Sequence, residues 1–250
     1  MAKVHLVMPM AGAGSRFAKQ GYDCPKPLMH IQGKPFFYWA AMSVAGFVRL
    51  HDITFVVLQE HVEQHHIDRA IHEFFPQASI IVLSQVLPGP VFTALVAVEK
   101  MPSDGPVVFN DCDHLFYCPD MYQALNAAEF TAAGGLLTFA SQEPQFSYVR
   151  YGAQQDIIGT VEKQVVSEHA ICGAYTFHDA AMFRSIADEY ISKCPYNECF
   201  MSGMYNIMCE RGLALTEFLL QYHVEFGTPV EYAAALQSEL FQAFTQELSL

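Results

Sequence analysis

Three short segments of the chain carry glycines, basic side chains and carboxylates in patterns that suit a phosphorylated ligand. Gly12-Ala13-Gly14-Ser15-Arg16 follows an apolar run, and its glycines let the backbone approach a ligand and turn N–H groups toward phosphate oxygens. In Pro25-Lys26-Pro27, two prolines stiffen the chain on either side of one lysine. The carboxylates of Asn110-Asp111-Cys112-Asp113 suit a hard cation such as Mg²⁺. Each segment taken alone has a simpler explanation: a tight turn for the first, a lysine exposed to solvent for the second, and an Asp-x-Asp that arose by chance for the third.

The glycine-rich segment differs from two common nucleotide-binding loops. Phe17 stands where a dinucleotide-binding fingerprint requires its third glycine. No Gly-Lys-Ser/Thr follows, so the segment is not a Walker A loop either. A phosphate site at this position therefore belongs to another class of loop.

Charge is distributed unevenly along the chain. The formal net charge is −13 at pH 7, yet residues 1–50 contain six basic side chains and one acidic one. The overall balance argues against a general nucleic-acid binder, whereas a locally cationic segment suits a small polyanion, with chance clustering as the alternative. No apolar run reaches about 18 residues, which argues against a membrane span. The seven cysteines are scattered without a Cys-x-x-Cys pair, as is typical of reduced thiols in a cytoplasmic protein.

Apolar runs alternate with helical patterns and indicate the elements that must position these segments. We expect strands at 3–10, 53–58, 79–83, 106–109 and 135–140, and helices at 35–47, 60–75, 90–100 and 119–128. The second part is expected to add strands at 148–151, 157–162, 170–177, 215–220 and 222–225, and helices at 179–190, 199–211 and 229–244. This alternation predicts an α/β fold with a doubly wound, mainly parallel, Rossmann-like sheet, which binds ligands at the carboxyl ends of its strands. Without a linker or repeat, we predict one domain over residues 1–250.

Read together, the N-terminal motifs closely resemble a family signature. Residues 7–17, Gly21-Tyr22, Pro25-Lys26-Pro27-Leu28 and Gly33-Lys34-Pro35 match in order and spacing the signature of the sugar-phosphate nucleotidyltransferases, also called NDP-sugar pyrophosphorylases. The resemblance implies a glycosyltransferase-A-like fold of the compact single-domain type, an NTP substrate and Mg²⁺ as cofactor. It also implies an NTP-binding part at about 1–140 and an acceptor-binding part at about 141–250.

The resemblance implies roles for individual residues. The catalytic residues are Arg16, on the pyrophosphate, and Lys26, on the reacting phosphates. The nucleotide-binding residues are Ala11, Gly12, Ala13, Gly14, Gln85 and Gly89, the last two for the base. The metal ligands are Asp113 and Glu225, with Asp111 as a further candidate. The acceptor-binding residues are Glu162, Lys163 and Gly173.

Several positions depart from the family pattern. Glu225 replaces the usual Asp before Gly-Thr-Pro, and Gln164 replaces the proline that usually follows the lysine. A helix cap is the alternative reading of Glu225. Pro90 has no N–H and so lacks one backbone contact to the base. His61 and His65 share a helical face, but no acid completes the His-Glu-x-x-His zinc pattern, so a solvated face is favoured.

We therefore expect an enzyme that transfers a nucleoside monophosphate from an NTP to a sugar 1-phosphate or a similar phosphorylated small molecule, in nucleotide-sugar or surface-polysaccharide biosynthesis. The nucleobase is open, and so is the choice between a sugar phosphate and a phosphocholine-like acceptor. Two alternatives are a glycosyltransferase of the same fold and a non-catalytic nucleotide-binding regulatory subunit. The expected partners are the two substrates, without nucleic acid or membrane, and a homo-oligomer is an open alternative.

Overall fold

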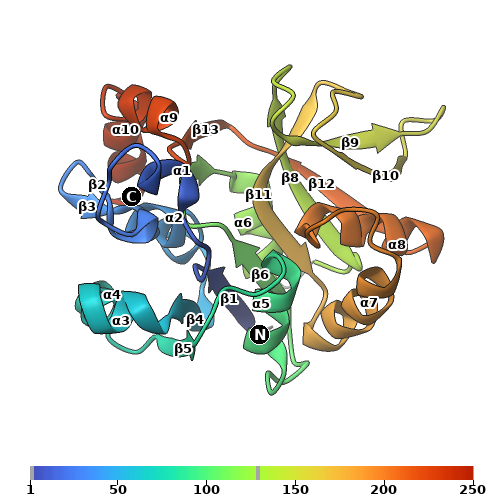
Figure 1. Cartoon of the computed structure of the whole chain (residues 1–250). Coiled ribbons are helices and arrows are strands. Elements are labelled where there is room, and N and C mark those ends of the chain that lie inside the picture. The colour runs from blue at the N-terminus through green and yellow to red at the C-terminus, as the bar shows by residue number, and fades with distance from the viewer. Residues whose placement is uncertain (1–2, 128–129, 250) are drawn as a thin grey trace.

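A nine-stranded sheet forms the centre of the computed structural model, which describes residues 3–127 and 130–249 (Figure 1). Its main path runs β10-β9-β11-β6-β1-β4-β5, and β8 pairs with β11 and β12. The strands are β1 (Val4–Pro9), β4 (Leu50–Leu58), β5 (Ser79–Leu83), β6 (Val107–Asn110), β8 (Gly134–Ala140), β9 (Ser147–Tyr151), β10 (Ile157–Glu162), β11 (His169–Phe177) and β12 (Leu215–Leu219). Within the same described ranges, β2 (His30–Ile31) pairs with β3 (Lys34–Pro35), and β7 (His114–Tyr117) pairs with β13 (Tyr222–Glu225).

The first half of the sheet is parallel. β1 lies between β4 and β6, and β5 pairs with β4, all in parallel. The β1 residues from Val4 to Met8 are at most 1% exposed, as expected for a parallel strand covered on both faces. Beyond β6 the sheet is mixed, because β11 runs antiparallel to β6, β8 and β9. The predicted α/β fold with a mainly parallel, Rossmann-like sheet is confirmed.

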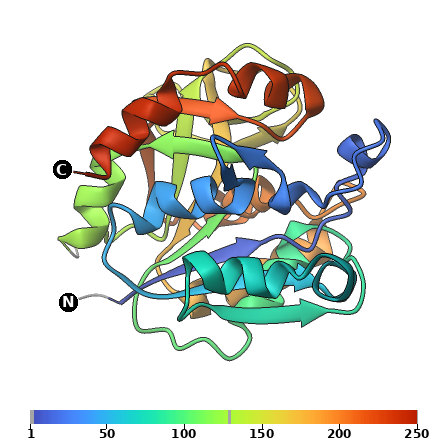
Figure 2. The same cartoon turned by 90° about the vertical axis from the view of Figure 1, so that its left-hand side faces the viewer.

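Helices cover both faces of the sheet (Figures 1 and 2). They are α1 (Ser15–Ala18), α2 (Phe36–Ala45), α3 (Gln59–His65), α4 (Ile67–Phe74), α5 (Pro90–Val98), α6 (Pro119–Asn126), α7 (Ala180–Lys193), α8 (Met204–Glu210), α9 (Pro229–Ala235) and α10 (Leu240–Glu247), with 3₁₀ turns η1 (Lys26–Leu28) and η2 (Met201–Gly203). One buried cluster packs α2, α4 and α6 with Leu6 and Met8 of β1, and another packs α5, α7 and α8 with Val7. Across the described part of the chain, every helix falls short of the length and apolarity that a bilayer span needs.

Two predicted helices are interrupted. The pattern over 60–75 predicted one helix, but His66 adopts a left-handed conformation, with φ of 53°, that ends α3 and begins α4. The pattern over 229–244 gives α9 and α10, because a turn through Ser238 intervenes and its hydroxyl accepts a hydrogen bond from the N–H of Leu240. The predicted helix 199–211 likewise begins with η2 before α8. Apolar spacing does not register such local changes of backbone direction. Residue 128, at the end of predicted helix 119–128, lies outside the described residues.

A third buried cluster joins the C-terminal helices to the N-terminal loops. Phe17 of α1 and Phe36 of α2 pack with Phe226, Phe241 and Phe244. Figure 1 shows α9 and α10 beside the β2–β3 hairpin. The segment after β13 is therefore held next to the glycine-rich loop, although more than half the chain separates them in sequence.

Candidate active site

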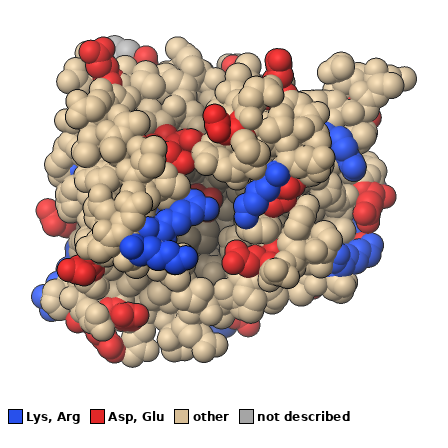
Figure 3. All heavy atoms as spheres, turned by 45° about the horizontal axis from the view of Figure 1, so that its top comes forward, with Lys and Arg blue, Asp and Glu red and all other residues tan. Residues whose placement is uncertain are grey.

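A cavity of about 220 Å³, here called the cleft, opens beyond the carboxyl end of β6. The space-filling view shows a hollow with basic side chains on both sides and acidic side chains around it (Figure 3). Part of the residue set singled out from the sequence lines the cleft, namely Arg16, Asp111, Asp113, Glu162, Gly173 and Glu225. Segments from both ends of the chain thus face one space.

Lys26 meets Asp113 at the edge of the cleft. Pro25 and Pro27 flank the lysine at η1, and Lys26 Nζ donates a hydrogen bond to Asp113 Oδ2 at 2.8 Å. The two side chains are 25% and 24% exposed. Burial disfavours both charges, but the mutual attraction outweighs it, raising the pKa of Lys26 and lowering the pKa of Asp113. The two groups are therefore held as an ion pair.

The glycine-rich loop packs against this lysine. A Cβ atom at Gly14 would lie 3.6 Å from the Lys26 Cβ, and Gly14 has a left-handed φ of 58° that glycine adopts without strain. The loop then enters α1, where Phe17 is buried and its neighbour Arg16 is exposed. Arg16 lines the cleft and lies close enough for its charge to act on Asp113. The anchoring of Phe17 in the third cluster therefore positions a cation at the cleft.

The pairing of β7 with β13 brings Glu225 near Asp113. Glu225 lies opposite His114 in this antiparallel ladder, and the N–H of the residue that follows it donates to the Asp113 carbonyl oxygen at 3.0 Å. Gly227 permits this approach, because a Cβ atom there would collide with Asp113 Oδ2. Burial, followed by the charges of Glu231 and Asp113, raises the pKa of Glu225 to about 8. Strand pairing thus brings two carboxylates together across more than a hundred residues.

Asp111 lies against Gly173. The Asp111 N–H donates to the Gly173 carbonyl oxygen at 3.1 Å, and a Cβ atom at Gly173 would lie 2.8 Å from Asp111 Oδ2. Gly173 also has a φ of 88°, so both the space and the backbone require glycine. Burial, reinforced by the charge of Asp113, raises the pKa of Asp111. Gly173 therefore supports a carboxylate as well as lining the cleft.

The donor set suits a divalent cation that shares its coordination shell with a substrate. Within the described residues, no group of three or more His, Cys, Asp or Glu side chains is arranged to hold a metal by itself. Asp113 and Glu225 nevertheless both line the cleft, close enough for the charge of Asp113 to act on Glu225, and a cation would offset their negative charge. Mg²⁺ commonly binds through one or two carboxylates and completes its shell with waters and substrate phosphates. The residues therefore fit such an ion in the presence of a nucleotide.

Glu162 is fixed in the cleft by two hydroxyl groups. Ser147 Oγ and Ser202 Oγ both donate to Glu162 Oε2, the latter at 3.1 Å. Lys163 follows with a left-handed φ of 54°, and its exposed Nζ lies 4.9 Å from the centre of the Phe200 ring at the cleft wall. The orientation of the Glu162 carboxylate is therefore set before a ligand arrives.

A second cavity of about 270 Å³, here called the loop cavity, adjoins the Lys26 turn. Gly12, Ala13 and Gly14 line it together with Lys26. Ala11, by contrast, is only 2% exposed and packs in the core. The predicted nucleotide-binding residues of the glycine loop therefore face the loop cavity rather than the cleft.

The predicted base-contacting residues line neither of these two cavities. Gln85 is exposed, and its neighbour Val86 lines the loop cavity. Gly89, with φ of 121°, packs against Cys199, since a Cβ atom there would lie 2.8 Å from the Cys199 backbone nitrogen. Pro90 follows and lines the cleft. Gly89 thus connects the parallel half of the molecule to the segment before η2.

The sequence did not identify His223, which also lines the cleft. Asn110 Nδ2 donates to the Ala40 carbonyl oxygen, so its Oδ1 accepts from His114 Nε2 at 2.8 Å. His114 Nδ1 can then accept from His223 Nε2 at 3.2 Å. Burial lowers the pKa of His114 to about 4 and also lowers the pKa of His223, so both rings are neutral. Strand alternation was the available signal, because His223 and Glu225 share one face of β13.

Comparison with known families identifies the class of protein. The sequence model of the nucleotidyl transferase family matches residues 6–239. The chain therefore belongs to the nucleotidyl transferase family, and the family prediction is confirmed. A comparison with curated protein sequences gives no match.

Several solved structures share the fold. A nucleoside-diphosphate-sugar pyrophosphorylase from Vibrio cholerae RC9 superposes with a TM-score of 0.78 at 23% identity, covering 93% of this chain and 100% of that chain. A putative glucose-1-phosphate thymidylyltransferase from Bacillus anthracis, in complex with a sucrose, gives 0.75 at 18% identity, covering 94% of each chain. The inositol-1-phosphate CTP transferase from T. maritima gives 0.75 at 13% identity, covering 99% of this chain and 96% of that chain.

Proposed function

We propose that the protein transfers a nucleoside monophosphate from an NTP to a phosphorylated small molecule, with a sugar 1-phosphate as the favoured acceptor, and releases pyrophosphate. The observation that carries the proposal is the Lys26–Asp113 contact beside Glu225, at a cleft that Glu162 also lines. Cations suited to phosphates and carboxylates suited to a metal ion thus share one space. The pyrophosphorylase and thymidylyltransferase among the structural relatives support a sugar phosphate as the acceptor.

The proposed reaction is an in-line displacement. A phosphate oxygen of the acceptor forms a bond to the α-phosphorus of the NTP, the bond to the β-phosphate oxygen breaks, and pyrophosphate leaves. Lys26 and Arg16 neutralise phosphate charge, while N–H groups of residues 12–14 bind phosphate oxygens. A divalent cation, Mg²⁺ in our proposal, supplies further positive charge when held by Asp113 and Glu225. Positioning and charge neutralisation suffice for such a transfer, so no protein nucleophile is required.

On the acceptor side, the proposal uses side chains of the mixed half of the sheet. Glu162, oriented by the Ser147 and Ser202 hydroxyls, accepts a hydrogen bond from an acceptor hydroxyl group. Lys163, exposed beside Phe200, approaches the acceptor phosphate. The division into an NTP-binding part at about 1–140 and an acceptor-binding part at about 141–250 stays a prediction.

A pyrophosphate-release assay tests this function. The four ribonucleoside triphosphates and dTTP are each combined with Mg²⁺ and with glucose 1-phosphate, inositol 1-phosphate or phosphocholine. We expect one combination to release pyrophosphate in equal amount to a nucleotide-linked product. Nucleotide binding without release in any combination would favour a regulatory subunit. A parallel incubation with a ready-made nucleotide sugar tests the other alternative, because its consumption would favour a glycosyltransferase.

We further propose that this reaction serves nucleotide-sugar or surface-polysaccharide synthesis in the cytoplasm. The resemblance to sugar-phosphate nucleotidyltransferases and the pyrophosphorylase relative support this setting. The identity of the acceptor found in the assay tests it, because a product that is not a nucleotide-linked sugar would point to a different pathway.

A further inference from the structure

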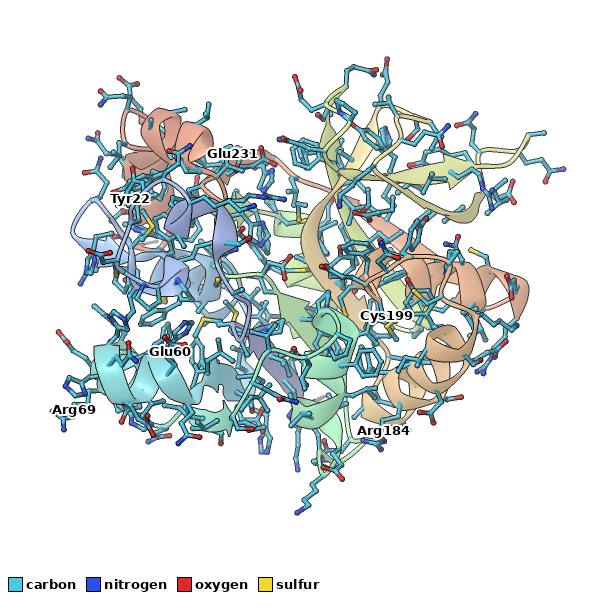
Figure 4. All side chains as sticks on the ribbon, viewed as in Figure 1. Tyr22, Glu60, Arg69, Arg184, Cys199 and Glu231 are labelled. Carbon is cyan, nitrogen blue, oxygen red and sulfur yellow. The ribbon has the colours of Figure 1, made fainter. Side chains whose placement is uncertain are left out.

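The loop cavity contains two histidines to which the proposed reaction gives no role. His61 and His65 of α3 line it opposite the glycine-rich loop and Lys26. α3 begins directly after β4, the parallel neighbour of β1, and the glycine-rich loop follows β1. The loop cavity therefore lies at the carboxyl ends of two adjacent parallel strands, where ligands bind in sheets of this kind. Tyr22 and Glu60, two further lining residues, lie on the same side of the molecule (Figure 4).

The Lys26 turn connects the loop cavity to the cleft. Lys26 lines the loop cavity, and its Nζ contacts Asp113, which lines the cleft. Val86, next to the predicted base-contacting residue Gln85, forms another part of the loop-cavity wall. A ligand with its phosphates at Lys26 and its reacting phosphorus near Asp113 therefore has space for its remaining part in the loop cavity.

We propose that His61 and His65 take part in binding the NTP, by hydrogen bonds to its ribose or base in the loop cavity. This inference rests on the proposed function, to which it adds binding residues outside the family motifs. The two histidines are four residues apart on α3, so they share one face of that helix. Both are half-buried, so a ligand in the loop cavity would contact rings already partly removed from water.

The chemistry of these side chains suits a nucleoside better than a metal ion or a phosphate. Burial lowers the pKa of His61, although the charge of Glu60 partly opposes it, so the ring is neutral at pH 7. A neutral imidazole offers one hydrogen-bond donor and one acceptor, which match a ribose hydroxyl or a base edge. Within residues 3–127 and 130–249, no cluster with enough ligands to hold a metal forms around either histidine.

Binding of nucleotides and of a nucleoside-free competitor tests the inference. Calorimetry measures the affinity of each Mg·NTP and of inorganic tripolyphosphate, without acceptor, for the wild type and for His61→Ala, His61→Gln and His65→Ala. We expect each alanine variant to weaken NTP binding by about tenfold and to leave tripolyphosphate binding unchanged, because only the nucleoside contacts are lost. Gln64→Ala, at an exposed position on the same helix, serves as the matched control.

Two outcomes would overturn the inference. Unchanged NTP affinity in His61→Ala and His65→Ala, with thermal unfolding like that of the wild type, would leave the histidines without a role in binding. His61→Gln, whose amide keeps a donor and an acceptor, should retain more of the NTP affinity than His61→Ala. Equal weakening of NTP and tripolyphosphate would show a general disturbance of the phosphate loop. A wild type that binds NTPs but releases no pyrophosphate would instead defeat the proposed function and leave the nucleoside site standing.

Discussion

The nucleotide side and the acceptor side of the cleft are built in different ways. On the nucleotide side, the glycine-rich loop and Asp111 follow strand ends of the parallel sheet, each within a short contiguous segment. On the acceptor side, Glu162 depends on the hydroxyl of Ser147, on the paired strand β9, and on that of Ser202, from η2. Local sequence therefore specifies the first side, whereas tertiary packing specifies the second. Substitutions on the nucleotide side should therefore act by removing charge from the substrate site. Substitutions on the acceptor side should act by disturbing the contacts that orient a side chain.

The largest expected effect is loss of charge on the nucleotide side. Lys26→Ala should lower the turnover of pyrophosphate release by about a hundredfold or more, because removal of one donor aimed at developing charge has effects of that size. Initial rates at saturating substrate measure it. Lys19→Ala, which removes an exposed lysine from the end of α1, is the control and should retain wild-type turnover. Equal turnover in Lys26→Ala and Lys19→Ala would contradict the role of Lys26 in neutralising phosphate charge.

Substitutions of Gly173 and Gly14 should differ in their cost to the stability of the protein. Gly173→Ala should cost about 2 kcal/mol of unfolding free energy, because a side chain there meets Asp111 and the φ of 88° is unfavourable. Gly14→Ala should cost about 1 kcal/mol, because its φ of 58° is left-handed but its nearest contact, at 3.6 Å, is ordinary. Urea denaturation measures both. A larger loss for Gly14→Ala would contradict the tighter constraint that the contact with Asp111 places on Gly173.

A substitution at Glu162 should affect one substrate only. Glu162→Gln keeps the side-chain shape but weakens a hydrogen bond to an acceptor hydroxyl, so the acceptor KM should rise about tenfold while the NTP KM stays constant. Steady-state kinetics with each substrate varied in turn measures this. Glu168→Gln, at an exposed position, is the control. An equal rise in the KM values of both substrates would contradict a role for Glu162 in binding the acceptor alone.

The last expected effect concerns the pH dependence of stability. The pKa of Glu225 is about 8 in the folded chain, through burial and neighbouring charge, against an ordinary 4.5. The folded chain therefore holds more protons, and the free energy of unfolding should fall as pH rises from about 4.5 to about 8. Glu225→Gln should flatten this decline in urea denaturation without divalent cations.

His5 also contributes to the pH dependence of stability, and the comparison of wild type with Glu225→Gln controls for it. His5 is buried, which lowers its pKa, but Asp52 and Asp104 outweigh burial and raise it. Its stabilisation is also lost as pH rises, in the wild type and in Glu225→Gln alike, so it cancels in the difference. Parallel curves for the two proteins would contradict the assignment of a raised pKa to Glu225.

The same contrast explains what the sequence could predict. The parallel strands β1 and β6 appeared as apolar runs because both of their faces are buried, and the segments after them carried recognisable motifs. The break at His66 was not predictable, because one left-handed residue leaves the apolar pattern intact. Strand β7 was not predicted because it is short and is defined by its pairing with β13, which is distant in sequence.

Among the site residues, predictability followed the same division. Lys26 and Asp113 were recognised from adjacent residues, and the structure joins them by an ion pair. Glu225 was found only through its resemblance to a family segment, since no local property of the chain links it to Asp113. Ser202 could not be anticipated, because it meets Glu162 across a long stretch of chain. For His223, the available sequence signal was that it shares one face of a predicted strand with Glu225.

The most direct test of the account is a double-mutant cycle between Asp113 and Glu225. The value of kcat/KM for pyrophosphate release is measured for Asp113→Asn, Glu225→Gln and the double variant at fixed Mg²⁺. If both carboxylates serve one metal–triphosphate site, the first substitution already removes that site, and the double variant should be about as slow as the slower single variant. Losses that multiply would mean that the two carboxylates act independently and would contradict a shared site.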